Sequence, residues 1–160
     1  MKILILGASY GSLLSTKLLM AGHDVTLICR SKSAALINEE GTEVRIKLRD
    51  EDSHRAFRSH DLAGTLDAVT PADARPEDYD MISLAMQEPQ YSEPQVRDLM
   101  QRIAASRKPC LSIMNMPPLP FLRRIDALAD APLEMCSDDA SVWADFEPGL
   151  MSLCSPDPQA

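Results

Sequence analysis

The first thirty residues decide the fold: Lys2-Ile-Leu-Ile-Leu6, then Gly7-Ala-Ser-Tyr-Gly11-Ser12, an apolar run, and Asp24-Val-Thr-Leu-Ile-Cys29 with Arg30. The first segment is short, apolar and closed by a glycine, which predicts a strand buried on both faces, as in a parallel sheet. The run that follows has apolar residues at helical spacing: Leu13, Leu14, Leu18 and Ala21. Strand, glycine turn, helix and second strand form a βαβ unit, which leaves the turn at the carboxyl edge of the sheet.

The turn at residues 7–12 has features of a dinucleotide-binding turn. A pyrophosphate needs a tight backbone and the free N–H groups of a helix N-terminus, and this turn follows a strand and opens a helix. The usual G-x-G-x-x-G spacing is altered, because a serine stands at the second glycine position and the next glycine arrives one residue early. We expect these residues to contact a cofactor: Gly7, Ala8, Ser9, Tyr10, Gly11 and Ser12. The alternative is a tight turn that binds no ligand.

The end of the second strand indicates which nucleotide would bind. NAD sites place an acidic residue there to hold the ribose hydroxyls, and a carboxylate would repel a 2′-phosphate. This chain has Cys29-Arg30-Ser31-Lys32-Ser33 instead. Two cations and two hydroxyls suit a phosphate dianion, so Arg30 and Lys32 predict NADP as the cofactor. The alternative is that both cations are merely solvated.

Composition narrows the classes of function. A chain of 160 residues suits one folded domain, and its net charge of -8 argues against a non-specific grip on nucleic acid. No apolar run is long enough to cross a bilayer, and the N-terminus lacks signal-peptide features, so we expect a cytoplasmic protein without a membrane partner. The cysteines fall singly, which predicts neither a disulfide framework nor a metal site: Cys29, Cys110, Cys136 and Cys154.

The rest of the chain alternates between strand and helix patterns. Strands are expected at residues 42–48, 53–59, 65–69, 81–85, 110–114 and 133–136, helices at 31–40, after Ser92-Glu93-Pro94 and at 119–129, and a closing hairpin at 142–154. The fold class predicted is α/β and Rossmann-like, a mostly parallel doubly wound sheet with helices on both faces and a C-terminal β-hairpin. Residues 1–155 form the dinucleotide-binding domain in this interpretation, and 156–160 a linker or the truncated start of a missing helical domain.

Two further strand ends lie at the same edge as the glycine turn if the sheet is parallel. Ala85, Met86 and Gln87 close one buried strand, and Asn115 closes the next. Ligands bind along this edge in open α/β sheets, so we expect these residues to contact cofactor or substrate. Asn115 has the alternative role of capping the helix that follows.

In these segments the chain resembles the N-terminal domain of ketopantoate reductase, which reduces 2-dehydropantoate with NADPH. The matching motifs are the first strand with its glycine turn, residues 21–30, residues 79–85, the strand ending in Asn115, and Gly149-Leu-Met-Ser-Leu. The resemblance implies that Arg30 contacts the 2′-phosphate and that Asn115 sits near nicotinamide and substrate. It also implies a catalytic lysine in a second, helical domain. At the position after the central strand where the family has another lysine, this chain has Gln87.

The sequence therefore predicts the NADP-binding domain of an oxidoreductase that transfers hydride from NADPH to a 2-keto acid or related small carbonyl substrate. We expect this chain alone to be inactive, with no catalytic residue of its own assigned, and a missing helical domain or a second copy in a homodimer to complete it. One alternative is a non-catalytic NADP sensor related to atypical short-chain reductases, since no tyrosine has a lysine four residues on. The other is an interaction domain that has lost its nucleotide.

Overall fold

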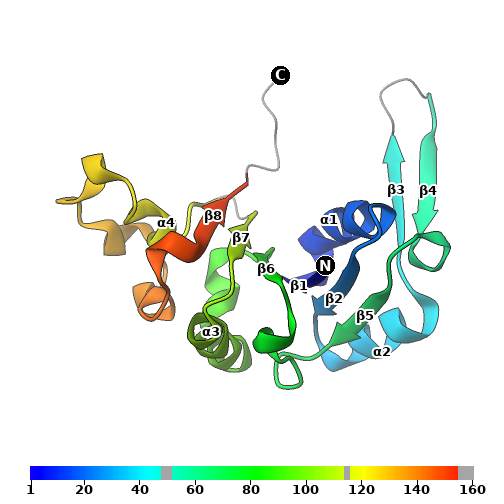
Figure 1. Ribbon diagram of the computed structural model, residues 1–160, viewed down its shortest axis with the longest axis horizontal. Helices are drawn as coiled ribbons and strands as arrows, with labels where there is room; N and C mark the ends of the chain where they lie inside the picture. Colours follow the sequence, from blue (N-terminus) through cyan, green and yellow to red (C-terminus); the bar gives the residue numbers. More distant parts are fainter. Residues whose placement is uncertain (48–51, 114–115, 155–160) are drawn as a thin grey trace.

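A six-stranded parallel sheet forms the centre of the molecule (Figure 1), in a computed structural model that describes residues 1–47, 52–113 and 116–154. The strands lie in the order β5-β2-β1-β6-β7-β8, and each neighbouring pair runs parallel. Their bounds are β1 Lys2–Leu6, β2 Asp24–Ile28, β5 Leu66–Val69, β6 Met81–Leu84, β7 Cys110–Ser112 and β8 Met151–Leu153. The predicted parallel, Rossmann-like sheet is confirmed.

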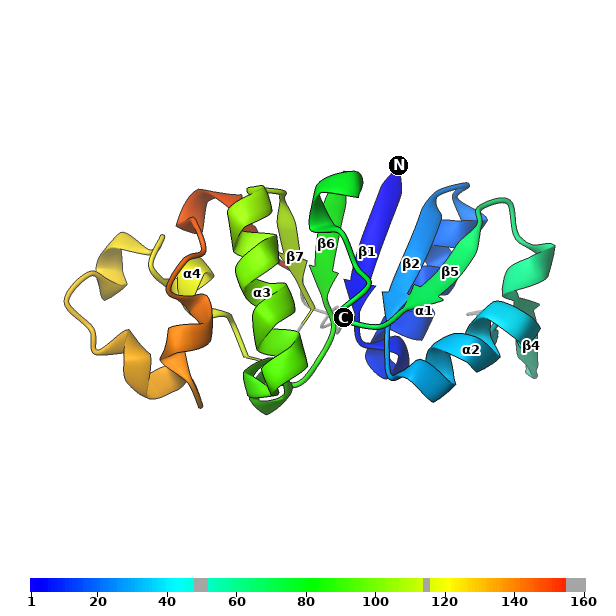
Figure 2. The same ribbon diagram turned by 90° about the horizontal axis from the view of Figure 1, so that it is seen from below.

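Helices cover both faces of the sheet. They are α1 Ala8–Met20, α2 Ser31–Glu40, α3 Pro94–Ser106 and the short α4 Leu119–Leu122. One core cluster joins β1, β2 and β5 residues to α1 and α2, and the other joins sheet residues to α3 and the C-terminal turns. Figure 2 shows α3 in front of β7 and roughly aligned with that strand. The buried residues of α3 lie at helical spacing: Val96, Leu99, Met100 and Ile103.

The central strand β1 lies between β2 and β6, and its residues from Ile3 to Leu6 are at most 1% exposed. Such burial on both faces explains why the strand has a continuous apolar run rather than an alternating pattern. The alternating segments form a separate antiparallel hairpin, β3 Glu43–Lys47 and β4 His54–Arg58, which projects beside α1 in Figure 1.

The C-terminal part differs from the predicted hairpin. Residues 140–143 form a 3₁₀ turn, and β8 pairs parallel with β7 rather than antiparallel with a preceding strand. Val142, Trp143 and Phe146 are apolar because they cover the α3 face of the sheet, so their spacing was wrongly interpreted as a strand. The predicted strand 133–136 is likewise a 3₁₀ turn, and only Leu119–Leu122 of the predicted helix 119–129 is α-helical.

The buried face of α1 also differs from the predicted one. Leu13 is 45% exposed and Ala21 is exposed, whereas the buried residues are Gly11, Ser15, Thr16 and Leu19. A Cβ on Gly11 would lie 2.7 Å from Cγ2 of Ile5, so the helix approaches the sheet too closely for a larger side chain. Small residues together with Leu19 therefore form the contact face, and the half-buried Leu14 and Leu18 flank it. The predicted linker 156–160 lies outside the described residues.

Candidate functional site

The candidate site lies at the carboxyl edge of the sheet, where four neighbouring parallel strands end. Gly7 follows β1, Arg30 lies just beyond β2, Ala85 follows β6 and Ile113 follows β7. Figure 2 shows these strands pointing to the same edge. The expected meeting of the glycine turn with the residues after the 81–85 strand is therefore present in the structure.

Gly7 makes the tight turn from β1 into α1. Its backbone has φ 104° and ψ 102°, a conformation that favours glycine, and its N–H donates to the carbonyl of Ile28 at 3.2 Å. A Cβ at this position would lie 2.6 Å from the carbonyl oxygen of Ala85. The turn is thus held closely between the ends of β2 and β6.

The first turn of α1 leaves donors free. Among the described residues, the N–H groups of Ala8, Ser9 and Tyr10 have no hydrogen-bond acceptor, as is usual at a helix N-terminus. No acidic residue occupies this turn, so nothing in it competes for the positive end of the helix dipole. Gly11 is different, since its N–H donates to the Gly7 carbonyl at 2.9 Å, and the Ser12 hydroxyl donates to the Ser9 carbonyl at 2.8 Å.

The two cationic site residues lie where β2 ends and the helix α2 begins. Arg30 is the N-cap residue of α2 and Lys32 lies in its first turn, which also lacks acidic residues. Both side chains are exposed, and neither makes an ion pair within the described part of the chain. Cys29 beside them is half-buried, and burial raises the pKa of its thiol, which disfavours the reactive thiolate there.

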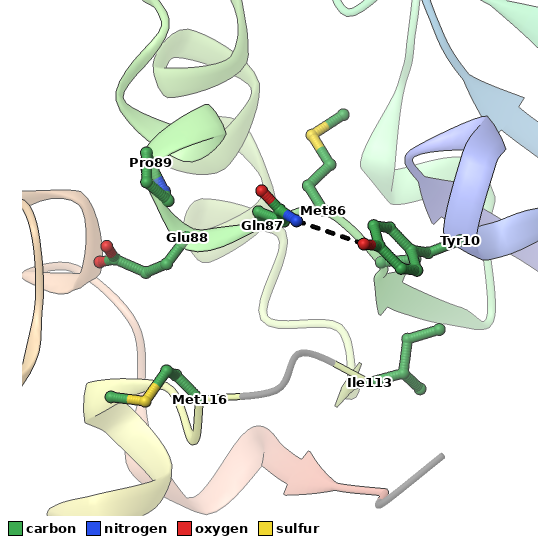
Figure 3. Close-up of a pocket in the computed structure, with 8 residues that line it drawn as sticks. Tyr10, Met86, Gln87, Glu88, Pro89, Ile113 and Met116 are labelled. Carbon is green, nitrogen blue, oxygen red and sulfur yellow. Dashed lines mark hydrogen bonds between the residues drawn. The ribbon is translucent and has the colours of Figure 1, made fainter. Parts of the chain in front are cut away.

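A cavity of about 230 Å³ opens between the first turn of α1 and the ends of β6 and β7 (Figure 3). Its lining residues are Tyr10, Ala85, Met86, Gln87, Glu88, Pro89, Ile113 and Met116. Gln87 Nε2 donates to the Tyr10 hydroxyl at 3.2 Å, so the two segments are bridged along one side of the cavity. The Tyr10 side is open to solvent, with the residue 58% exposed.

The wall formed by residues 86–88 is held from behind by an aromatic column. The hydroxyl of buried Tyr91 accepts from the Met86 N–H at 3.1 Å, and burial raises the pKa of this phenol, which keeps it neutral. The Tyr91 ring lies 5.4 Å from that of Trp143, which lies 5.6 Å from that of Phe146. Sequence reasoning missed this support, because no local pattern links residue 91 to residue 143.

Glu88 fixes the same wall to the C-terminal turns. Its carboxylate accepts from the Ser137 hydroxyl and from the Asp138 N–H, the latter at 2.9 Å. These partners lie 49 and 50 residues away in the chain. The sequence carries no signal for such a pairing, so Glu88 was not among the expected site residues.

The expected site residues thus fall into two groups. The structure brings the α1 turn together with Ala85, Met86 and Gln87, and it puts Arg30 and Lys32 at the end of the neighbouring strand β2. Asn115 lies outside the described residues. Within the described ranges, no group of three or more His, Cys, Asp or Glu side chains could hold a metal ion. No helix in those ranges is long and apolar enough to cross a membrane.

The strand order, the parallel pairing and the glycine turn at the start of α1 define a Rossmann-type α/β domain. The family model for ketopantoate reductase PanE/ApbA matches residues 3–115. The chain belongs to the ketopantoate reductase family, as its N-terminal motifs predicted. A search of curated proteins returns no match.

Solved structures support the same fold. A protein from Ralstonia solanacearum, provisionally assigned as a ketopantoate reductase, is 18% identical with a TM-score of 0.67, and the match covers 97% of this chain and 44% of that one. A 2-dehydropantoate 2-reductase from Methylococcus capsulatus is 16% identical with a TM-score of 0.50, covering 82% and 38%. The chain therefore spans less than half the length of these structures.

Proposed function

We propose that the carboxyl edge of this domain binds NADP, and that the chain is the cofactor-binding part of an oxidoreductase of the ketopantoate reductase family. The reaction would be hydride transfer from NADPH to the carbonyl carbon of a 2-keto acid or related compound. The observation that carries the proposal is that two helix N-termini, α1 and α2, open to one edge with free donors on α1 and free cations on α2.

The α1 turn suits the diphosphate. The three free N–H groups of Ala8, Ser9 and Tyr10 and the positive end of a 13-residue helix stabilise an anion without any side-chain cation. Gly7 allows the backbone to lie close to the ligand, and Gly11 allows the helix to pack closely on β1. The serine at position 9 keeps its N–H available, so the altered spacing of the glycines is compatible with this role.

The start of α2 suits the 2′-phosphate of NADP. Arg30 and Lys32 have no competing carboxylate in the helix turn that carries them, and the Ser31 and Ser33 hydroxyls lie in the same turn. An arginine can donate paired hydrogen bonds to a phosphate, whereas NAD would offer only ribose hydroxyls here. Selectivity for NADP over NAD follows from this difference in charge.

The bound cofactor would supply the hydride, and the chain's own residues would position its nicotinamide half near β6 and β7. The cavity beside Gln87 and Ile113 lies at that end of the edge. A catalytic lysine that donates the proton belongs, in this proposal, to a further domain or a partner chain. This chain alone would then bind cofactor without turning over substrate.

Calorimetric titrations with NADPH and NADH test the proposal. We expect NADPH to bind at least about tenfold more tightly than NADH. Arg30→Ala should weaken the free energy of NADPH binding by about 1.4 kcal/mol and change the affinity for NADH little. Lys17→Ala is the matched control, because it removes a positive charge from the last turn of α1, at the opposite end from the site.

Three results would contradict the proposal. Equal affinity for NADPH and NADH would remove the role of Arg30, and no binding of either would favour the interaction-domain alternative. Reduction of 2-dehydropantoate by residues 1–160 alone would contradict the expected need for a further catalytic group.

A further inference from the structure

Arg102 on α3 makes hydrogen bonds that tie this helix to the segment connecting β5 to β6. Its Nη2 donates to the carbonyl of Pro71 at 2.6 Å, and its Nη1 donates to the carbonyl of Ala74. Its Nε donates to the carboxylate of Asp98, four residues earlier on α3, at 3.1 Å. The guanidinium is therefore held by its own helix on one side and bridges two carbonyls on the other.

The segment that Arg102 contacts has few contacts of its own. Residues 70–75 lie between the end of β5 and a 3₁₀ turn at Pro76–Asp78. Among the described residues, one backbone hydrogen bond joins two members of this segment, from the Asp73 N–H to the Thr70 carbonyl at 3.2 Å. The Thr70 hydroxyl also donates to the Asp73 carboxylate at 2.5 Å. These local bonds close a turn, but they do not fix the turn to the rest of the domain.

The two carbonyls that Arg102 bonds belong to buried residues. Ala74 is 2% exposed and lies in the core cluster that includes α3, and Pro71 is buried as well. Within the described part of the chain, no backbone N–H donates to either carbonyl, so loss of Arg102 would leave both without a protein donor. The residues on either side of Pro71 are more accessible, since Thr70 is half-buried and Ala72 is exposed. Arg102 thus holds the buried residues of the segment and thereby sets the position of the accessible ones.

The segment begins beside the proposed 2′-phosphate site. β5 is the neighbour of β2 in the sheet, and the Cys29 N–H donates to the Val69 carbonyl at 3.1 Å where both strands end. Arg30 and Thr70 are the next residues of the two strands, so they start from adjacent backbone positions at the carboxyl edge. The adenosine half of a dinucleotide bound at this edge would lie within reach of both.

We propose that Arg102 is a positioning residue for the adenosine half of NADP. It holds the β5–β6 segment so that Thr70 and Ala72 form a preformed wall beside Arg30. The inference rests on the proposed function, because it takes the β2 end of the edge to be where the 2′-phosphate binds. It goes further by assigning a role in binding to a residue of α3 that does not itself touch the cofactor. A preformed wall raises affinity because the ligand does not have to order the segment.

The test uses adenosine 2′,5′-bisphosphate, the half of NADP that carries the 2′-phosphate and lacks the nicotinamide. The full chain and its Arg102→Ala variant are titrated with this probe by calorimetry, at a temperature below both unfolding midpoints. We expect Arg102→Ala to weaken binding of the probe about fivefold, because the probe must then order the segment itself. Unchanged affinity would overturn the proposal.

Arg97→Ala is the matched control, because it separates positioning from stability. Arg97 is on the same helix, and its side chain is 32% exposed against 34% for Arg102. It also binds a distant segment, through Asp139 and Ser141 on the C-terminal turns. Both variants should lower the free energy of unfolding in urea denaturation, but Arg97→Ala should leave the affinity for the probe unchanged. An equal loss of affinity in both variants would mean that general destabilisation is the cause, and the positioning role would fail.

Arg102→Lys separates position from charge. Lysine keeps the positive charge but lacks the planar fork that bridges two carbonyls. The variant should therefore still bind the probe about threefold more weakly than the wild type. Full recovery of affinity would show that the charge of residue 102 acts on the phosphates directly, which contradicts a positioning role. This variant also serves as the test if circular dichroism shows that Arg102→Ala is unfolded.

The wild-type chain tests the wall without any substitution. In ¹⁵N-labelled protein, the probe should shift the amide signals of Thr70 and Ala72, whereas that of Asp130 on the C-terminal turns should stay unchanged. Shifts at Arg30 without shifts at Thr70 and Ala72 would mean that the segment is no part of the adenosine site.

A titration with NADPH precedes these experiments, so that the two proposals can fail separately. If NADPH does not bind, the proposed function is contradicted and this inference falls with it. If NADPH binds but the bisphosphate does not, the adenosine half contributes too little for a preformed wall, and only this inference is overturned.

Discussion

The two ends of the carboxyl edge are built in different ways. At the β2 end, Arg30 and Lys32 are exposed side chains on the first turn of a helix, placed by the backbone next to them. At the β6 end, Met86 and Glu88 are held by Tyr91 and by residues about fifty positions away. A charged surface can be changed without disturbing the fold, whereas a packed wall cannot. Mutations at the first end should therefore alter binding, and mutations behind the second should alter stability.

Trp143→Ala should have the largest effect. Trp143 is fully buried and contacts both Tyr91 and Phe146, so its removal leaves a large cavity behind the wall of the site. We expect the free energy of unfolding to fall by about 3–5 kcal/mol. Urea denaturation followed by circular dichroism measures this, because Trp143 is the chain's single tryptophan and fluorescence would be lost with it.

Met135→Ala is the control for that experiment. Met135 is 83% exposed, so its truncation should change stability by less than about 0.5 kcal/mol. A loss below about 1 kcal/mol for Trp143→Ala would mean that the aromatic column does not support the fold, and the contrast between the two ends would fail.

Arg30→Asp should have the largest effect on cofactor binding. The affinity for NADPH should fall while the thermal stability of the protein rises. Reversing the charge at the proposed 2′-phosphate contact should weaken NADPH binding about 100-fold, equivalent to about 2.7 kcal/mol, and should favour NADH. Arg30 is also the N-cap of α2 without a side-chain capping bond, and aspartate is a preferred N-cap residue. The melting temperature should therefore rise as NADPH affinity falls.

These opposite shifts are measured on one sample by calorimetry and thermal denaturation. If NADPH affinity and stability fell together, Arg30 would have a structural role that its exposure does not indicate. Unchanged affinity would remove the β2 end from the cofactor site.

Gly7→Ala tests the point where the two ends meet. The backbone there has φ 104°, and a Cβ would lie 2.6 Å from the Ala85 carbonyl oxygen, so both strain and overlap oppose the side chain. We expect a loss of about 2–3 kcal/mol in urea denaturation. Gly22→Ala is the matched control, because Gly22 also has positive φ but no atom within 4 Å of the added Cβ, and it should cost about 1 kcal/mol.

Local patterns in the sequence predicted the local fold at one end of the candidate site. The βαβ unit was predictable because a strand buried on both faces, a glycine turn and a helical run each have a recognisable sequence pattern, and the three patterns follow one another within a few residues. Arg30 and Lys32 follow directly from the end of β2 in the same way. The right-handed crossover then fixes which face of the sheet the connecting helix covers, whereas the order of the strands was not predicted.

The other end depends on contacts that no short window contains. Val142, Trp143 and Phe146 suggested a strand, but their apolar character comes from covering the α3 face of the sheet as 3₁₀ turns. The buried face of α1 was predicted wrongly for a related reason. The leucines suggested an apolar contact face, whereas the helix approaches β1 so closely at Gly11 that small residues such as Gly11 and Ser15 are buried there. Small residues at a spacing of four were the available signal.

Tyr91→Phe isolates the hydrogen bond from the packing in the aromatic column. The ring stays in place, but the Met86 N–H loses its acceptor at 3.1 Å in a partly buried position. We expect a loss of about 1 kcal/mol, smaller than that of Trp143→Ala. Hydrogen exchange should report faster opening at the Met86 amide, and unchanged exchange there would show that water replaces the phenol without cost.

Tyr10→Phe should have the smallest effect on stability, because Tyr10 is 58% exposed and loses only its hydroxyl. The change in the free energy of unfolding should stay within about 0.5 kcal/mol.

The Tyr10 hydroxyl accepts from Gln87 Nε2 and so ties the α1 turn to the cavity wall at the place proposed for the diphosphate. Removing this tie should raise NADPH affinity by about twofold, since the ligand no longer has to displace the bond. Tyr79→Phe serves as the control on a tyrosine outside the cavity lining. A tenfold loss of NADPH affinity in Tyr10→Phe would instead mean that the hydroxyl binds the cofactor. Cofactor binding would then depend on a polar contact at the packed end as well as on the charged end, and the contrast between the two ends would fail.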